Sequence, residues 1–326
     1  MKFYLFICLT STCLIIWAIE ADWLSKQAPK KVMPEFIKNY QLKMKSSFVR
    51  PENANILFSF FTGNKDGISP YTKNAFKQTN LSYLFSPSGV HLAGILVFIL
   101  YFVKKISTKK GTSFLKFLIN ISLFFLPQFY TLHRLAVLRI SNQFNYLVKL
   151  KQPVEILFLF TFFISFSLGH YHHSPMGFIY SFIYLGTFIA FGMRPKISLI
   201  LGLFSTQLIL GIFFGNQASL LSIAVGLGGG YLFSLIFPLL IIFFSTFWIF
   251  EINWGEPIIR GFVLGTHYFS KILNGTYFSS SLFLIGAVWL LLFRNKPRYW
   301  LTLFTILFFL HSDGCMSPTI MRSWAN

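Results

Sequence analysis

The sequence has little charge and very few acids. Asp, Glu, Lys and Arg together make up 11% of its 326 residues, against about 25% in an ordinary soluble domain. Hydrophobic residues make up 55%, and the mean hydropathy is +0.63. This composition excludes a disordered chain, a coiled coil and a soluble enzyme, and it indicates a membrane protein that crosses the bilayer several times.

Cysteine is also scarce, and the sequence has no nucleotide-binding loop. Cys8, Cys13 and Cys315 show none of the spacings of a zinc site or a redox pair, which predicts unpaired or buried thiols. A Gly-x-x-x-x-Gly-Lys-Ser/Thr loop does not occur, which argues against ATP binding. The run HYHH at 170–173 has no acid or cysteine nearby, so a solvated loop is favoured over a metal site. We therefore expect no metal and no other cofactor.

Against nine acids stand 28 Lys and Arg residues, which gives a formal net charge of +19. The positive-inside rule explains many of these cations as markers of cytoplasmic loops, near 104–110, 149–151, 194–196 and 294–298. It does not account for Arg134 and Arg139, which fall within a helix-like segment. Nor does it account for the lysines between Lys26 and Lys77, which this topology places on the other side of the membrane.

Long apolar runs predict an all-α fold, a polytopic helical bundle with about ten transmembrane helices. The runs lie at 84–103, 112–131, 154–169, 175–192, 197–214, 218–250 and 279–311. The run at 218–250 is too long for one span and contains Gly228, Gly229 and Pro238, so we expect a broken or re-entrant helix pair there. We interpret 132–148 as a further, less apolar helix, with Arg134, Ser141 and Asn145 near one face.

Four regions follow from this reading. Residues 1–24 are expected to be an N-terminal membrane anchor or a signal peptide, and an uncleaved anchor is favoured because no clean cleavage site follows. Residues 25–80 form a short, basic, extracytoplasmic segment, which is too short for a large core of its own. Residues 81–314 form the transmembrane domain, and residues 315–326 form a tail.

Residues 62–94, TGNKDGISPYTKNAFKQTNLSYLFSPSGVHLAG, join a polar segment directly to a membrane helix. This stretch resembles the ComEC-type competence family of inner-membrane DNA-uptake channels. The family's Gly-Asp-type turn corresponds to 63–67, its Thr-Gly-Leu-like step to 79–81, and its Ser-Gly-Leu-His-Val to 88–92. An earlier histidine that is usual in the family is Tyr83 here.

The resemblance continues in order along the chain. The family's arginine segment falls on 127–134 and keeps Arg134, although most of its other positions differ. Its Gly-Phe-Gln-Leu-Ser-Phe is similar to 177–182, with Ile179 in place of Gln, and its Ala-Gln-Leu is similar to 206–208. Its Tyr-Phe-Gly and Ser-Leu-Leu resemble 213–215 and 219–221. The resemblance implies a core-only member, with a reduced N-terminal domain and without the metallo-β-lactamase-like domain.

The resemblance implies a conduit for single-stranded DNA across the bacterial inner membrane during natural transformation. It implies no bond-breaking activity, so the protein is not expected to be an enzyme. Expected partners are single-stranded DNA, membrane lipid, a DNA receptor, a cytoplasmic helicase and a nuclease. The residues implied to line the DNA path are Ser88, Gly89, His91, Arg134, Ser181 and Gln207, with Arg134 and Arg139 contacting phosphates.

Each of these residues also has a structural interpretation. Ser88, His91, Ser181 and Gln207 could form hydrogen bonds between helices, and the arginines could reach the membrane surface or pair with Glu155. A transporter or channel for small anionic solutes is the alternative function, and a membrane protein of another role that has lost DNA uptake is a second. A membrane enzyme that uses the HYHH run is a third.

Overall fold

The computed structural model describes residues 34–106, 109–125, 129–173, 175–191, 196–214, 217–277 and 285. The N-terminal anchor, the three cysteines, the apolar run at 279–311 (apart from residue 285) and the tail lie outside the described residues. The described residues form helices and no β-strand, as the all-α prediction requires. The chain divides into two compact units, which are treated separately below.

The larger described unit comprises residues 29–152 and 224–274, and we call it the α12 unit. Its first helices are α2 (Glu35–Ser47), α3 (Pro51–Thr62), α4 (Pro70–Gln78) and the 3-10 turn η1 (Ser82–Phe85). Then follow α5 (Gly89–Ile106), α6 (Lys109–Ser122), the 3-10 turn η2 (Leu123–Phe125) and α7 (Tyr130–Leu147). Most of α12 (Leu220–Phe250) and all of α13 (Glu256–Leu273) complete this unit.

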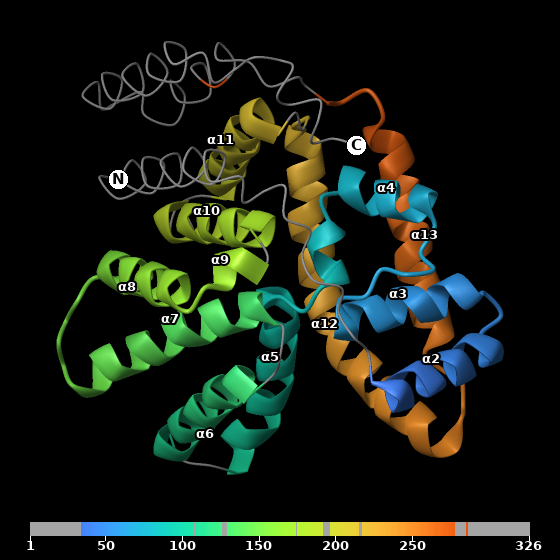
Figure 1. The fold of residues 1–326 in the computed structure, drawn as a ribbon, viewed down its shortest axis with the longest axis horizontal. Coiled ribbons are helices and arrows are strands. Elements are labelled where there is room, and N and C mark those ends of the chain that lie inside the picture. The colour runs from blue at the N-terminus through green and yellow to red at the C-terminus, as the bar shows by residue number, and fades with distance from the viewer. Residues whose placement is uncertain are drawn as a thin grey trace. The chain divides into compact units, whose positions relative to one another are not determined.

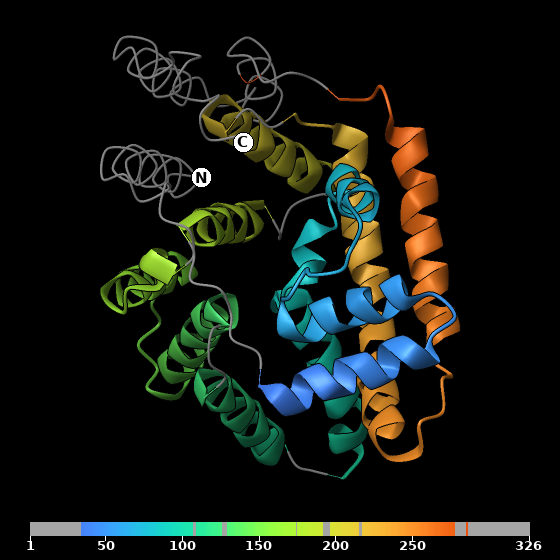
Figure 2. The same ribbon diagram turned by 45° about the vertical axis from the view of Figure 1, so that its right-hand side comes forward.

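The core of the α12 unit joins segments that lie far apart in the sequence. Buried apolar side chains come from α2, α3, α4, η1, α12 and α13, and Phe58, Phe76, Phe243 and Phe247 among them are fully buried. Figures 1 and 2 both show α2 and α3 side by side, and α13 packs against α3 and α4. Residues 34–80 therefore share a core with α12 and α13, which agrees with their being too short for a large core of their own.

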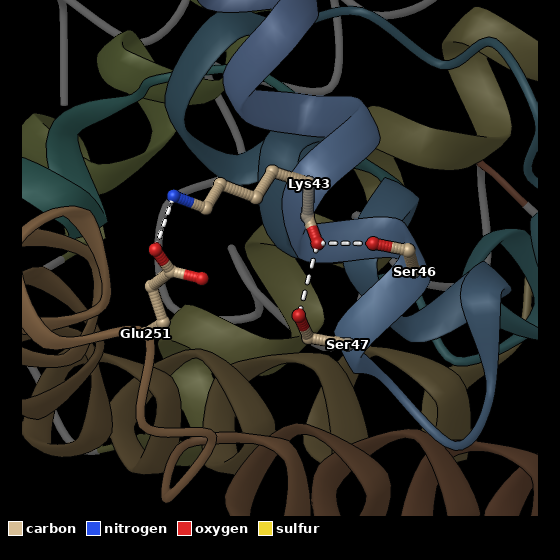
Figure 3. A network of polar contacts seen from close by, with 4 residues as sticks. All are labelled: Lys43, Ser46, Ser47 and Glu251. Carbon is tan, nitrogen blue, oxygen red and sulfur yellow. Dashed lines mark hydrogen bonds and ion pairs between the residues drawn. The ribbon is translucent and has the colours of Figure 1, made fainter.

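A surface contact links the end of α2 to the chain after α12 (Figure 3). The ammonium of Lys43 forms a salt bridge with the carboxylate of Glu251, and both side chains are about half exposed. The carbonyl oxygen of Lys43 accepts hydrogen bonds from the hydroxyls of Ser46 (2.8 Å) and Ser47 (3.0 Å). These hydroxyls bind a carbonyl in the last turn of α2, and the solvated ion pair adds little stability.

The second unit comprises residues 1–28, 153–223 and 275–326. Its described helices are α8 (Val154–Ser167), the short α9 (His170–His173), α10 (Pro175–Phe191) and α11 (Lys196–Phe214). Helices α10 and α11 pack together, and the hydroxyls of Thr187 and Thr206 lie 2.8 Å apart between them. The apolar runs predicted α8, α10 and α11 to within a few residues, whereas α9 lies where a solvated loop was expected.

The predicted break at Gly228, Gly229 and Pro238 is wrong, because α12 is one continuous helix of 31 residues. Proline removes a single backbone donor, and in an apolar environment the neighbouring backbone groups have no better partners than those within the helix. Three glycines of this helix, Gly226, Gly229 and Gly230, instead let residues 79–83 lie close against it. At 1.5 Å per residue the helix is about 46 Å long, longer than a hydrocarbon core of about 30 Å.

Within the described residues, α12 is the one helix that is both long and apolar enough to cross a membrane. Four shorter apolar helices accompany it, at Gly89–Val103, Val154–Ser167, Gly177–Phe191 and Ile197–Gly211. The figure of about ten spans remains a prediction.

Candidate functional site

The start of α5 is fixed by Ser88 and His91, two of the predicted path residues. Nδ1 of His91 accepts hydrogen bonds from the backbone N–H of Ser88 (3.1 Å) and from its hydroxyl (3.0 Å). His91 lies three positions after Ser88, so the imidazole occupies the place that Glu or Gln takes in a capping box. The Ser-Gly-x-His spacing is thus a helix-start signal as well as a polar cluster.

These hydrogen bonds determine where the proton of His91 lies. A backbone N–H can only donate, so Nδ1 must be unprotonated and the neutral ring carries its proton on Nε2. Nε2 is buried, and although the ring interacts with the backbone of Leu84, it forms no hydrogen bond of normal geometry with the described residues. The ring packs edge-on against Phe233 (4.8 Å) and Phe237 (4.6 Å) of α12.

The segment just before this site lies in a notch of α12 that Gly226 opens. A methyl group added at Gly226 would meet Cβ of Asn80 at 2.8 Å and the carbonyl oxygens of Thr79 and Asn80 at 3.1 Å. The hydroxyl of Tyr83 donates to the carbonyl oxygen of Gly226 at 3.3 Å. Only glycine permits such a close approach of backbone to backbone.

Two further glycines of α12 extend the notch. A Cβ at Gly229 would lie 3.0 Å from the side chain of Leu81, and one at Gly230 would lie 2.2 Å from the hydroxyl oxygen of Tyr83. The glycine cluster therefore seats residues 79–83, the counterpart of the Thr-Gly-Leu-like step. Gly228 has no atom within 4 Å of its added Cβ, because it lines a cavity that Thr79 and Leu81 also line.

Helix α5 approaches α12 closely one turn further on. An added Cβ at Gly94 would lie 2.5 Å from the carbonyl oxygen of Ser234, and one at Gly89 would lie 3.3 Å from the side chain of Leu135 in α7. Small residues that allow close helix approach are typical of packing in membranes. Gly89 and Gly94 thus hold α5 between α7 and α12.

The two predicted phosphate-binding arginines lie on α7. Arg134 is 1% exposed, and its guanidinium donates to the hydroxyl of Thr131 at 3.1 Å. Arg139 is half-buried. A guanidinium buried in an apolar helix bundle is rare and is typical of functional positions in membrane proteins. Asn145 instead closes the loop after α7, with two hydrogen bonds of 2.9 Å to the backbone of Gln152.

Ser181 of α10 and Gln207 of α11 belong to the second unit, whereas Ser88, His91 and Arg134 belong to the α12 unit. Within the second unit, Gln207 of α11 forms a hydrogen bond with the side chain of Tyr184 of α10. A hydrogen bond between helices is therefore the observed contact of Gln207.

Two carboxylates anchor the polar helices outside the apolar runs. Glu256, at the start of α13, accepts hydrogen bonds from the backbone N–H groups of Val49 (2.9 Å) and Arg50 (3.0 Å) at the start of α3. Glu52 accepts one from the backbone N–H of Ser69 (2.9 Å) at the start of α4. Burial raises the pKa of each carboxyl, but the hydrogen bonds outweigh it and leave both pKa values below their usual range.

The HYHH run forms the short helix α9, and the side chains of His172 and His173 lie outside the described part of the chain. Among the side chains that the structure describes, no three His, Cys, Asp or Glu gather as a metal site would require.

Comparison with known proteins relates the 79–91 segment to a family. Residues 60–139 match the family model of the competence protein. The match confirms the resemblance over this part of the chain, which runs from the end of α3 into α7 and includes Ser88, His91 and Arg134. It covers about a quarter of the sequence. No curated protein and no solved structure matches the chain.

Sequence reasoning missed α13 and the partners that complete the competence segment. The signal for α13 is Glu256-Pro257 in the first turn, followed by apolar residues at helical spacing. Phe233 and Phe237 could not be selected from the sequence, because phenylalanine is abundant throughout.

Proposed function

We propose that this protein conducts a single strand of DNA across the bacterial inner membrane during natural transformation. The observation that carries the proposal is the competence-family match at residues 60–139. The described part of this segment places a buried guanidinium, an imidazole and a serine among apolar helices. Buried polar groups of this kind are typical of substrate paths in membrane proteins.

The mechanism is conduction without bond-breaking. Lysines of the segment before α5 gather the polyanion on the outer side, because Lys and Arg bind phosphates through their charge in any sequence context. Arg134 contacts backbone phosphates, since its guanidinium fork matches two phosphate oxygens. A DNA receptor on the outer side delivers the strand, and a cytoplasmic helicase and a nuclease act as separate partners.

Deletion of the gene, followed by uptake of labelled DNA into the cytosol, tests the proposal. The deletion strain is expected to lose internalised DNA, and the wild-type gene supplied in trans is expected to restore it. Uptake at the wild-type rate in the deletion strain would refute the conduit.

Two substitutions at one position then test the guanidinium. Arg134→Ala is expected to reduce uptake strongly, and Arg134→Lys is expected to retain part of it, because lysine keeps the charge but loses the bidentate geometry. Equal amounts of each variant in the membrane, measured by immunoblot, separate this effect from loss of folding. Normal uptake with both variants would remove Arg134 from the path.

A further inference from the structure

An exposed aromatic side chain stands among lysines at the start of α4. Tyr71 is 62% exposed and is the one large hydrophobic side chain exposed between Val49 and Tyr83. Its ring stacks on the imidazole of His267 in α13, with centroids 4.8 Å apart and planes 9° apart. One face of the tyrosine is thus covered by the imidazole, and the high exposure leaves the other open to solvent.

Hydrogen-bonding groups of α4 hold the imidazole of His267, on which Tyr71 stacks, in place. Nε2 of His267 lies 3.4 Å from the hydroxyl of Thr72, which is buried. The backbone N–H of Thr72 bonds the hydroxyl of Ser69, the N-cap of α4. Burial lowers the pKa of His267, Lys271 lowers it further and Glu52 only partly opposes this, so the imidazole is neutral at pH 7. The stacked pair is therefore an ordered, uncharged platform.

Three lysines lie on or beside the two helices that carry the platform. Lys73 lies two residues beyond Tyr71, Lys271 lies one turn beyond His267, and Lys65 is close enough to Lys73 that burial and this neighbour together lower its pKa. In the part of the chain that the structure describes, the single salt bridge is that of Lys43, so no carboxylate neutralises these three lysines by direct pairing. The nearby acids are Glu52, which is bound to Ser69, and the exposed Asp66.

We propose that Tyr71 stacks on an unpaired base of single-stranded DNA while Lys65, Lys73 and Lys271 contact the neighbouring phosphates. An aromatic face flanked by cations is the common means of holding single strands without sequence preference, because every base has a π-face. The inference rests on the proposed function and names a binding site for its substrate on the outer side, before the strand reaches α5.

The chemistry of the patch favours a nucleic acid over a membrane surface. A segment that lies in the membrane interface needs a continuous apolar face. The exposed face of α4 carries Pro70, Tyr71, Asn74 and Lys77, and the proline ring is its one exposed aliphatic group. A lone aromatic ring among amides and ammonium groups suits a base and its phosphates better than an acyl chain.

Binding measurements on the full chain in nanodiscs of neutral phosphatidylcholine test the proposal. The probe is a fluorescent 12-nucleotide dT strand, followed by anisotropy. Tyr71→Ala is expected to weaken binding about 5- to 150-fold, which is the loss of stacking on one base. Tyr71→Phe keeps the ring and is expected to bind as the wild type does. Phe36→Ala, at an aromatic that is 61% exposed on α2, is the matched control and is expected to have no effect.

Two further readouts separate stacking from charge. A blunt DNA duplex of the same length has no unpaired base to offer, so Tyr71→Ala is expected to leave its affinity unchanged. Lys73→Ala is expected to reduce the slope of log affinity against log salt by about 0.7, the value for one phosphate contact on a single strand.

The outcomes distinguish the possibilities. Equal affinity of wild type and Tyr71→Ala for the single strand would overturn the proposal, and so would an equal loss with Phe36→Ala. If Tyr71→Ala instead loses binding to phosphatidylglycerol vesicles but keeps the wild-type affinity for the single strand, the patch binds the membrane surface and the proposal is overturned. If the gene deletion abolishes DNA uptake but Tyr71→Ala binds the single strand as the wild type does, the conduit function is supported and the Tyr71 binding site is refuted. If the deletion leaves uptake intact, the conduit itself is refuted.

Discussion

Replacing Gly94 and Gly226 by alanine tests whether α12 is held by direct backbone contacts. An added Cβ at Gly94 would lie 2.5 Å from the carbonyl oxygen of Ser234, whereas an ordinary contact begins near 3.4 Å. Helices α5 and α12 would therefore have to separate by about 0.9 Å. At Gly226 the shortest contact is 2.8 Å, to Cβ of Asn80, and two carbonyl oxygens lie 3.1 Å away.

The magnitude follows from two opposing effects. Overpacking against rigid backbone costs about 1–3 kcal/mol, while alanine in a helix gains up to about 1 kcal/mol over glycine. Gly228→Ala is the matched control, because it has the same gain in α12 and no atom within 4 Å of the added methyl group. Subtracting the change in unfolding free energy of Gly228→Ala from that of each other variant leaves the cost of the clash. We expect Gly94→Ala and Gly226→Ala to be less stable than Gly228→Ala by about 1–3 kcal/mol, with Gly94→Ala the more severe.

The assay is reversible unfolding of the full chain in mixed micelles, with SDS as the denaturant and tryptophan fluorescence as the signal. Gly228→Ala is expected to match or exceed the wild type in stability. If the three variants unfold together, the close approach of α5 and residues 79–83 to α12 does not exist, and the glycines would again be best explained as a flexible break.

Three further outcomes follow from the polar contacts. The native-state pKa of Glu256 is lowered, so the stability that this carboxylate contributes is present above its unfolded pKa near 4.5 and is lost as the pH falls through the native pKa. Glu256→Gln should therefore flatten the fall in stability that acid unfolding curves show. Gly67→Ala should destabilise the protein by more than about 1 kcal/mol, because φ is +77° and the new Cβ would meet the amide nitrogen of Asn55 at 2.4 Å; unchanged unfolding would contradict this. His91→Ala should cost about 1–3 kcal/mol by leaving the N–H of Ser88 unpaired, and His91→Gln should recover part of it through the same acceptor geometry; equal stability of the two variants would show that capping is not the role of His91.

The sequence predicts the helices of this protein better than it predicts their contacts. Apolar runs locate α8, α10 and α11 because a membrane environment demands long stretches without polar residues. The position of Ser88 and His91 at a helix start follows from the motif, which was confirmed by the family match at 60–139.

The contacts were harder to predict because a glycine has two opposite uses. Gly228 and Gly229 suggest flexibility when only their neighbours in the chain are considered, yet Gly229 packs against Leu81, about 150 residues away. Local sequence cannot tell a weak point in a helix from a place where another segment lies against it. The same limit hid Tyr71, whose partner His267 is on a helix that the apolar runs did not reveal.

The shared core of the α12 unit has a consequence for biosynthesis. Phe85 leaves the ribosome about 160 residues before Phe247, which belongs to the same buried core. At about 5–20 residues per second, the early segment waits roughly 10–30 s for α12 to arrive. During that interval the apolar side chains of the family-matched segment that α12 later covers stay uncovered. An insertase or chaperone that shields residues 51–106 until α12 is made would therefore limit how much of this protein matures.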